Sequence, residues 1–476
     1  MLPLVATVVC VLGILGLFAL DRDRQSQTSK ALWIPVVWLW IVGSREVSLW
    51  LAVFGIGHAG TELNSPDSYL SLESGSPPDR LVFTTLLVFG VAVLVSRGPE
   101  VGRLLRANLP ILLFFLYCAV SVFWSDYPEV AFKRWLKALG DVVMLMVVLT
   151  DRDPYAAVKR LLARTGFLLI PLSVLLIKYY PEVGKGFKHY GAPFYVGVTT
   201  NKNLLGIVCL IFGLGTLWRF LAAYRDRGGT HRTRRLAVHG ALLAMVLWLF
   251  LMAKSLTSLS CFLLAGGLMV ATSFGTRARK PWVVHFLVAT VVLVSFSTLF
   301  FDVGGFALET MGKDPSLTGR TKIWELVLSL SGNPLFGTGF ESFWLGPRLN
   351  RIWSVFWWHP NEAHNGYIEV YLNLGWIGVA LLAVLIVTGY RNVVLLLRGD
   401  SDVGRLMLAY FVASVVYNFT EAGFRMLDLV WITFLLAIMA VPGVWARSKT
   451  KSAVQLGAFS RQLAPSLEEV RPSCNP

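Results

Sequence analysis

The residues best suited to chemistry stand where a long polar stretch, residues 302–363, gives way to an apolar run. His364 and Asn365 open that run, and Gly375 and Gly378 follow in H-N-G-Y-I-E-V-Y-L-N-L-G-W-I-G. A neutral imidazole at the outer end of a helix can accept a hydroxyl proton near neutral pH. The alternative is a histidine that only marks a membrane interface, because lone histidines are seldom catalytic. Three carboxylates could fix the tautomer of the imidazole, and the sequence does not choose between them: Glu341, Glu362 and Glu369.

A second group of candidates is cationic. Four basic residues stand at the ends of apolar runs or in the loops between them: Lys202, Lys254, Arg320 and Arg425. Together they could hold a pyrophosphate, because cations stabilise a departing phosphate electrostatically. Local loop or capping roles are the alternative. Arg45 and Glu46 fall in the middle of an apolar run, where unpaired charge is costly, so we expect a structural ion pair there.

Aromatic residues gather in the polar stretch and alternate with arginines. The cluster contains Trp344, Arg348, Arg351, Trp353, Phe356, Trp357 and Trp358. Aromatic faces and arginines could bind sugar rings. An interfacial aromatic belt is the more common explanation of such a cluster beside a membrane.

Other chemistries lack their motifs. The chain has no G-x-x-x-x-G-K-[ST] phosphate loop and no glycine fingerprint of a dinucleotide-binding fold. The segment H-P-N-E-A-H, His359 to His364, lacks the spacing of a helical metal site, and Pro360 opposes a helix through both histidines. We therefore expect no metal and no cofactor. Any reaction must use energy already stored in its substrate.

The elements that must position these residues are membrane-spanning helices. The 476 residues are 55% hydrophobic and 15% charged, whereas a soluble domain carries about 25% charge. Thirteen apolar runs of roughly 16–27 residues can be drawn, and about 20 helical residues cross a bilayer. The predicted fold class is all-α: a polytopic membrane protein with about 12–13 transmembrane helices and one large extracytoplasmic loop. The net charge of +15 lies mainly in short loops, which indicates membrane orientation and not nucleic-acid binding.

The distribution of Lys and Arg between alternate loops predicts which side faces the cytoplasm. By the positive-inside rule, the N-terminus and the large loop lie outside. The chain then divides into four regions: about ten N-terminal transmembrane helices (1–301), the extracytoplasmic loop with a short amphipathic helix at Thr321–Leu330 (302–365), about three C-terminal transmembrane helices (366–446) and a disordered cytoplasmic tail (447–476).

Taken together, these motifs and apolar runs resemble those of the bacterial O-antigen ligase and polysaccharide polymerase superfamily. His364-Asn365, nine residues, Gly375, two residues and Gly378 fit the family's H-[NSQ]-x9-G-x-x-[GTY] signature. Further similar segments are W-S-D-Y-P-E-V-A-F-K-R-W, T-N-K-N-L-L-G, L-T-G-R-T-K-I-W and G-T-G-F. The resemblance covers nearly the whole chain and is strongest to the exopolysaccharide-polymerase branch, similar to proteins of succinoglycan-type export systems.

The resemblance implies metal-independent glycosyl transfer on the periplasmic face of the bacterial inner membrane. The donor would be an oligosaccharide on undecaprenyl pyrophosphate, and polymerisation of its repeat units would give an exopolysaccharide. In this family His364 would be the catalytic base and Arg320 would support donor binding. Proteins of the family often have the motif S-[RK]-T in the turn between two helices in the middle of the chain. This chain has Leu256 at the position of the Arg or Lys. Our hypothesis is that Lys254 or Lys202 substitutes for the missing cation.

Asn365 and Arg425 complete the predicted substrate-binding set. The expected partners are the lipid-linked oligosaccharide, membrane lipid, a chain-length regulator and export proteins, with no nucleic acid. Two other functions stay open. One is an O-antigen ligase that transfers glycan to lipid A–core, and the other is a lipid-linked glycan flippase or other transporter, which should tolerate loss of His364.

Overall fold

The computed structural model describes residues 2–21, 28–56, 76–187, 193–226, 228, 231–274, 280–300, 317–399 and 401–441. Its elements are α1 (Leu2–Leu20), η1 (Lys30–Leu32), α2 (Trp33–Val42), α3 (Val47–Val53), α5 (Pro77–Ser96), α6 (Gly98–Ala107), α7 (Leu109–Ser121), η2 (Val122–Trp124), α8 (Pro128–Leu149), α9 (Pro154–Tyr179), α10 (Pro181–Gly184), β1 (Lys185–Phe187), β2 (Pro193–Tyr195), α11 (Lys202–Arg225), α12 (Arg232–Ala253), α13 (Leu256–Phe274), α14 (Pro281–Phe300), α16 (Leu317–Ser329), α17 (Gly346–Val355), α18 (Gly366–Gly399), α19 (Ser401–Tyr417) and α20 (Leu429–Ile438). The predicted tail and residues 302–316 of the predicted loop lie outside the described residues.

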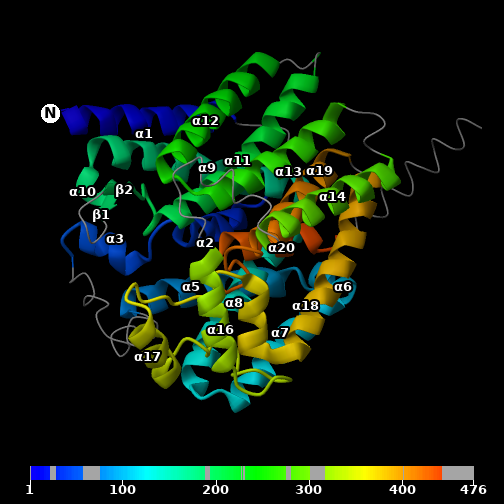
Figure 1. Cartoon of the computed structure of the whole chain (residues 1–476). Helices are drawn as coiled ribbons and strands as arrows, with labels where there is room; N and C mark the ends of the chain where they lie inside the picture. Colours follow the sequence, from blue (N-terminus) through cyan, green and yellow to red (C-terminus); the bar gives the residue numbers. More distant parts are fainter. Residues whose placement is uncertain are drawn as a thin grey trace, which may run out of the picture.

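Most of these helices pack into one bundle with α11 near its centre (Figure 1). α11 contacts α9, α12, α13, α19 and α20, and α18 contacts α7, α19 and α20. Their buried residues form one continuous apolar core. By contrast, α1 leaves most of its apolar side chains exposed, as a helix facing lipid would. The only sheet among the described residues is the antiparallel pair β1–β2.

The mostly helical, multi-pass class is confirmed, but fewer helices than expected meet the requirements for a full span. Seven described helices are long and apolar enough to cross a membrane, or up to nine if each bent pair is one span. Among the described residues, length and composition alone therefore support fewer spans than the twelve to thirteen expected. α8 carries several charges in its first half, and α19 and α20 are short, with 17 and 10 residues.

One predicted span is broken where its two charged residues lie. The helix pair of residues 30–42 and 47–53 is bent by 67° around Arg45 and Glu46. Arg45 donates from Nε to the Thr199 carbonyl (3.1 Å) and from Nη2 to the Val183 carbonyl (2.5 Å). The arginine is thus structural, and its described hydrogen bonds go to backbone oxygens beyond its own span, whereas the expected ion pair with Glu46 stays a prediction.

The described part of the large loop folds onto the bundle and has its own small core. In Figure 1, α16 and α17 lie on the side of the molecule where α18 begins, well away from α1. α16 corresponds to the predicted amphipathic helix and buries Ile323 and Val327. These side chains pack in a cluster with Phe343, Trp344, Leu345, Leu349, Ile352, Ala363 and Leu372. The apolar face of α16 therefore meets protein, and this small core carries the loop that ends at His364.

Candidate functional site

The glycine of the H-N-x9-G signature marks a break in α18. Gly375 has φ 63° and ψ −165°, and a Cβ there would lie 2.3 Å from the Leu335 carbonyl. At the break, the amides of Trp376 and Ile377 donate to the carbonyls of Pro334 and Leu335 at 2.9 and 3.2 Å. Backbone groups freed by a helix break must find partners at membrane depth. The segment just before F-G-T-G-F supplies these partners. The spacing in the signature therefore fixes the distance along the chain from His364 to the break in α18.

The segment F-G-T-G-F forms further backbone hydrogen bonds with α18, on the N-terminal side of the break. The amides of Thr338 and Gly339 donate to the carbonyls of Leu372 and Asn373 at 3.1 and 2.9 Å. Gly337 and Gly339 both have positive φ, at 69° and 94°, and backbone atoms crowd the position of a Cβ at each. The loop segment and the first part of α18, up to Gly375, are therefore one interlocked unit.

The residues just before His364 are held by buried donors and acceptors. Trp324 Nε1 donates to the Ala363 carbonyl (2.8 Å), and the Ala363 amide donates to Glu369 (2.5 Å). Glu369 also accepts from Trp344 Nε1 at 3.0 and 2.9 Å. Glu369, a predicted partner of the imidazole, instead fixes the backbone beside it.

A second loop approaches His364 from between α19 and α20. Asn418 accepts from the amides of Gly423 and Phe424 at 2.8 and 2.9 Å, and its carbonyl accepts from the Gly366 amide (2.9 Å). A Cβ on Gly366 would lie 1.8 Å from Asn418 Oδ1. This close approach lets the turn of Glu421 reach the start of α18.

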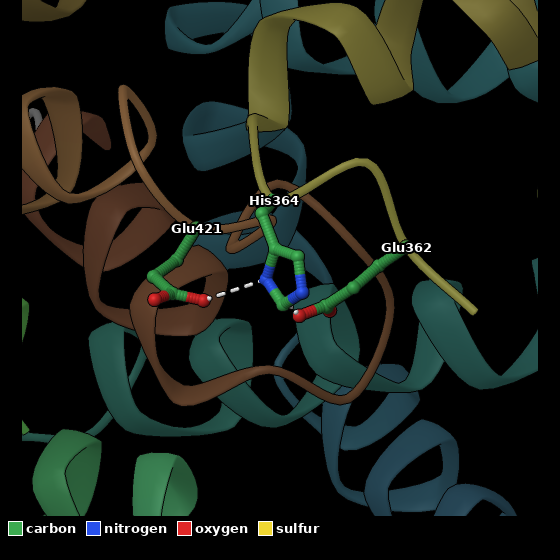
Figure 2. Close-up of side chains that lie close together, drawn as sticks. All are labelled: Glu362, His364 and Glu421. Carbon is green, nitrogen blue, oxygen red and sulfur yellow. Dashed lines mark hydrogen bonds and ion pairs between the residues drawn. The ribbon is translucent and has the colours of Figure 1, made fainter. Parts of the chain in front are cut away.

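The imidazole of His364 lies between two carboxylates (Figure 2). Its Nδ1 is 3.0 Å from Glu362 Oε1 and 3.1 Å from Glu421 Oε2. Burial alone would lower the pKa of His364, but hydrogen bonds and charge from Glu362 and Glu421 raise it to about 10. The ring is therefore an imidazolium at neutral pH, with Nδ1 facing both carboxylates.

Each carboxylate also faces an arginine. Arg320 Nη2 lies 3.4 Å from Glu421 Oε1, and Arg425 Nη1 lies 3.1 Å from Glu362 Oε2. Burial would raise the pKa of Glu362, but His364 and Arg425 lower it. Five side chains thus form a row of alternating charge in the order Arg320, Glu421, His364, Glu362, Arg425.

A cavity of about 650 Å³ opens beside this row. Its lining includes Lys202 and Arg425 together with Glu362 and Glu421. The structure therefore brings four predicted site residues to one place, with His364 and Arg320 joined to the lining through the carboxylates. A ligand with two phosphate groups would meet at least two cations here.

Two predicted binding residues have other positions. Asn365 is 4% exposed, and its Oδ1 accepts from the amides of Tyr367 and Ile368 at 3.0 and 3.1 Å, which caps the start of α18. Its Nδ2 donates to the Phe419 carbonyl (3.1 Å), so the side chain is committed to structure. Lys254 is exposed, has φ 50° at the end of α12, and does not line the cavity. Of the two cations proposed to replace the missing one, Lys202 is the better placed.

Judged by distance alone, the imidazole of His364 and its two neighbouring carboxylates could bind a metal cation. Glu362, His364 and Glu421 each offer a ligand atom, and these atoms lie within 4.8 Å of one another. A metal ion would have to displace Arg320 and Arg425 from their carboxylates and take the proton's place on Nδ1. The donor set therefore fits an imidazolium better than a divalent ion.

Sequence reasoning missed Glu421. It lies 57 residues beyond His364, at the end of a predicted span. The available signal was E-A-G-F-R, Glu421 to Arg425, two ionisable residues between apolar helices, since charge at such a position has a functional or structural partner. Glu341, the third predicted partner of the imidazole, accepts instead from the Met426 amide (3.2 Å).

Comparison with known proteins points to one family. The family model described as O-antigen ligase matches residues 240–383, which include Lys254, Arg320 and His364. The chain is 24% identical to the exopolysaccharide production protein ExoQ of Rhizobium meliloti (strain 1021), over 68% of this chain and 74% of that protein. It is 21% identical to a protein of Rickettsia felis named as a candidate polysaccharide ligase, over 72% of this chain and 85% of that protein. The family resemblance predicted from the sequence is thereby confirmed: residues 240–383 match the O-antigen ligase family model, and the chain is a multi-pass membrane protein.

Proposed function

We propose that this protein joins lipid-linked oligosaccharide repeat units into an exopolysaccharide. The donor is an oligosaccharide on undecaprenyl pyrophosphate, and the reaction takes place at the periplasmic face of the inner membrane. In this proposal residues 302–365 are an extracytoplasmic loop and residues 447–476 a cytoplasmic tail. The observation that supports it is a histidine between two carboxylates beside a cation-lined cavity, in a chain related to an exopolysaccharide production protein.

The reaction needs one bond made, one bond broken and one proton moved. An acceptor hydroxyl oxygen attacks the anomeric carbon of the donor sugar, and the bond from that carbon to the pyrophosphate oxygen breaks. The hydroxyl proton passes to Nε2 of His364 when the ring is neutral. Arg320, Arg425 and Lys202 stabilise the negative charge of the leaving pyrophosphate. No metal ion is required by this scheme.

The carboxylates orient the base. Since both lie at Nδ1, the neutral ring keeps its proton on that atom and presents the Nε2 lone pair to the acceptor. Charge from the carboxylates also stabilises the imidazolium that forms after proton transfer. Glu421 and Glu362 are thus positioning residues.

The test uses purified protein in detergent with an undecaprenyl-pyrophosphate oligosaccharide as sole substrate. Products are resolved by size for the wild type, His364→Ala and the control His231→Ala, which changes an exposed histidine at the start of α12. A ladder of multiples that disappears only in His364→Ala supports a polymerase. A ladder that persists in His364→Ala would remove the histidine from the mechanism.

Ligation is the second candidate, because the matching family model is described as O-antigen ligase and one relative is named for that activity. In the same assay, a ligase forms product only after lipid A–core is added. If neither acceptor reacts, the proposed glycosyl transfer is wrong and transport of a lipid-linked glycan becomes the better explanation.

A further inference from the structure

The loop that carries His364 also places an indole ring against it. The ring centroids of Trp358 and His364 are 6.0 Å apart, and the two planes are inclined by 29°. Phe356 contacts the same indole at 6.0 Å. Trp358 is 40% exposed, so an aromatic surface next to the imidazole is accessible to a ligand.

The backbone on both sides of this indole is fixed. Trp353 stacks on His359 with centroids 4.5 Å apart, and its Nε1 donates to the Pro360 carbonyl (2.9 Å). The His359 amide donates to the Phe356 carbonyl (3.1 Å), which closes the turn around Trp358. A surface held in this way needs little ordering when a ligand binds.

The indole N–H distinguishes Trp358 from its neighbours. The N–H groups of Trp324, Trp344 and Trp353 donate to protein acceptors at 2.8–3.0 Å. Trp358 Nε1 has no such acceptor among the described residues. An interfacial belt would explain an exposed tryptophan, but not a near-parallel contact with His364.

We infer that Trp358 is the stacking platform for the terminal sugar of the acceptor glycan. This inference rests on the proposed function. The carboxylates and their arginines lie at the Nδ1 edge of His364, so the donor pyrophosphate belongs on that side. The acceptor hydroxyl belongs at Nε2. A sugar whose apolar face covers the indole presents its hydroxyls around the edge of the stack, where one reaches Nε2 and another accepts the indole N–H.

Acceptor binding can be measured separately from catalysis, because no transfer occurs without the lipid donor. The probe is the repeat-unit oligosaccharide released by partial hydrolysis of the host's own exopolysaccharide, titrated calorimetrically into the full chain in nanodiscs. The variants are Trp358→Leu, which removes the aromatic face, and Trp358→Phe, which keeps one. Trp282→Ala is the matched control, because Trp282 is 68% exposed and lies on α14.

Trp358→Leu should weaken oligosaccharide binding about tenfold, and Trp358→Phe about threefold or less. With the lipid donor present, Trp358→Leu should raise KM for labelled oligosaccharide by the same factor and leave kcat within about threefold, because His364 keeps its carboxylate partners. Wild-type affinity in Trp358→Leu overturns the stacking platform and leaves the proposed function standing. A ladder assay that fails, together with no binding by the wild type, overturns both. Equal losses in both Trp358 variants would also refute stacking, since phenylalanine retains an aromatic face.

Discussion

Replacing Glu421 with glutamine should move the pH dependence of catalysis to lower pH. The two carboxylates at Nδ1 raise the pKa of His364 from 6.5 to about 10, although burial opposes them. About one ring in a thousand is then neutral at pH 7. Only the neutral ring can take the hydroxyl proton, so the wild-type rate should rise about tenfold per pH unit until the pH approaches that pKa.

Glutamine keeps the size of Glu421 and an oxygen that can accept from Nδ1, but it removes the charge. If the two carboxylates contribute comparably, losing one lowers the pKa of His364 by roughly 2 units. The rate of Glu421→Gln should therefore level off near pH 8, about 2 units earlier than in the wild type. At pH 7 its neutral population is up to about 100-fold larger, and the gain in rate is smaller because the ring is a weaker base.

The assay is the initial rate of ladder formation from pH 6.5 to 10 at saturating lipid donor. Glu129→Gln is the control, because this exposed carboxylate pairs with Lys133 on the same helix. A wild-type rate that stays flat between pH 7 and 9, while His364→Ala is inactive, would refute the base and favour an imidazolium that only stabilises charge. An unchanged profile in Glu421→Gln would refute the coupling of its carboxylate to the ring.

Three further outcomes are expected. Gly375→Ala should lower the stability by about 3 kcal/mol, because the residue has positive φ and a crowded Cβ position; its melting temperature in detergent should fall, and that of Gly267→Ala, with open space around the Cβ, should not. Lys202→Ala should raise KM for the lipid donor about tenfold and Lys254→Ala should leave it unchanged, since only the first lines the cavity; equal effects would contradict the assignment. The raised pKa of His364 contributes stability that is fully present below pH 6.5 and is lost as the pH rises through about 10; the wild-type melting temperature should therefore fall more between pH 8 and 10 than that of His364→Gln, and parallel curves would refute the link.

The sequence predicted the fold class and pointed to the candidate site because both inferences depend on local patterns. Apolar run length gives membrane spans, and the fixed spacing from His364 to Gly375 points to one short segment. It did not predict Glu421, because that contact depends on how the turn after α19 meets the start of α18. Nor did it predict that Asn365 would be consumed as a helix cap, since an asparagine can serve a ligand or a backbone amide equally well.

The number of spans shows the same limit from another side. A hydropathy plot places Arg45 and Glu46 inside one apolar helix, where charge is energetically unfavourable. In the structure the chain bends by 67° at these residues, and the arginine donates hydrogen bonds to carbonyls distant in the sequence. Composition likewise cannot say that Arg134 of α8, only 4% exposed, donates to the Glu341 carbonyl. Tertiary partners determine how these polar groups are accommodated, and one sequence does not reveal them.

The break at Gly375 has a consequence for assembly and engineering. The amides of Trp376 and Ile377 have their partners in Pro334 and Leu335, so this stretch of α18 has its amides satisfied only after the preceding segment has docked. A chain that lost this segment would expose the amides to lipid, at a cost of several kcal/mol each. The chain changes from polar to apolar between residues 365 and 366, but these hydrogen bonds connect the two sides. An engineered chain should therefore not be divided at that position. A chimera that takes the loop before α18 from a relative should also take the first part of α18, at least as far as Gly378.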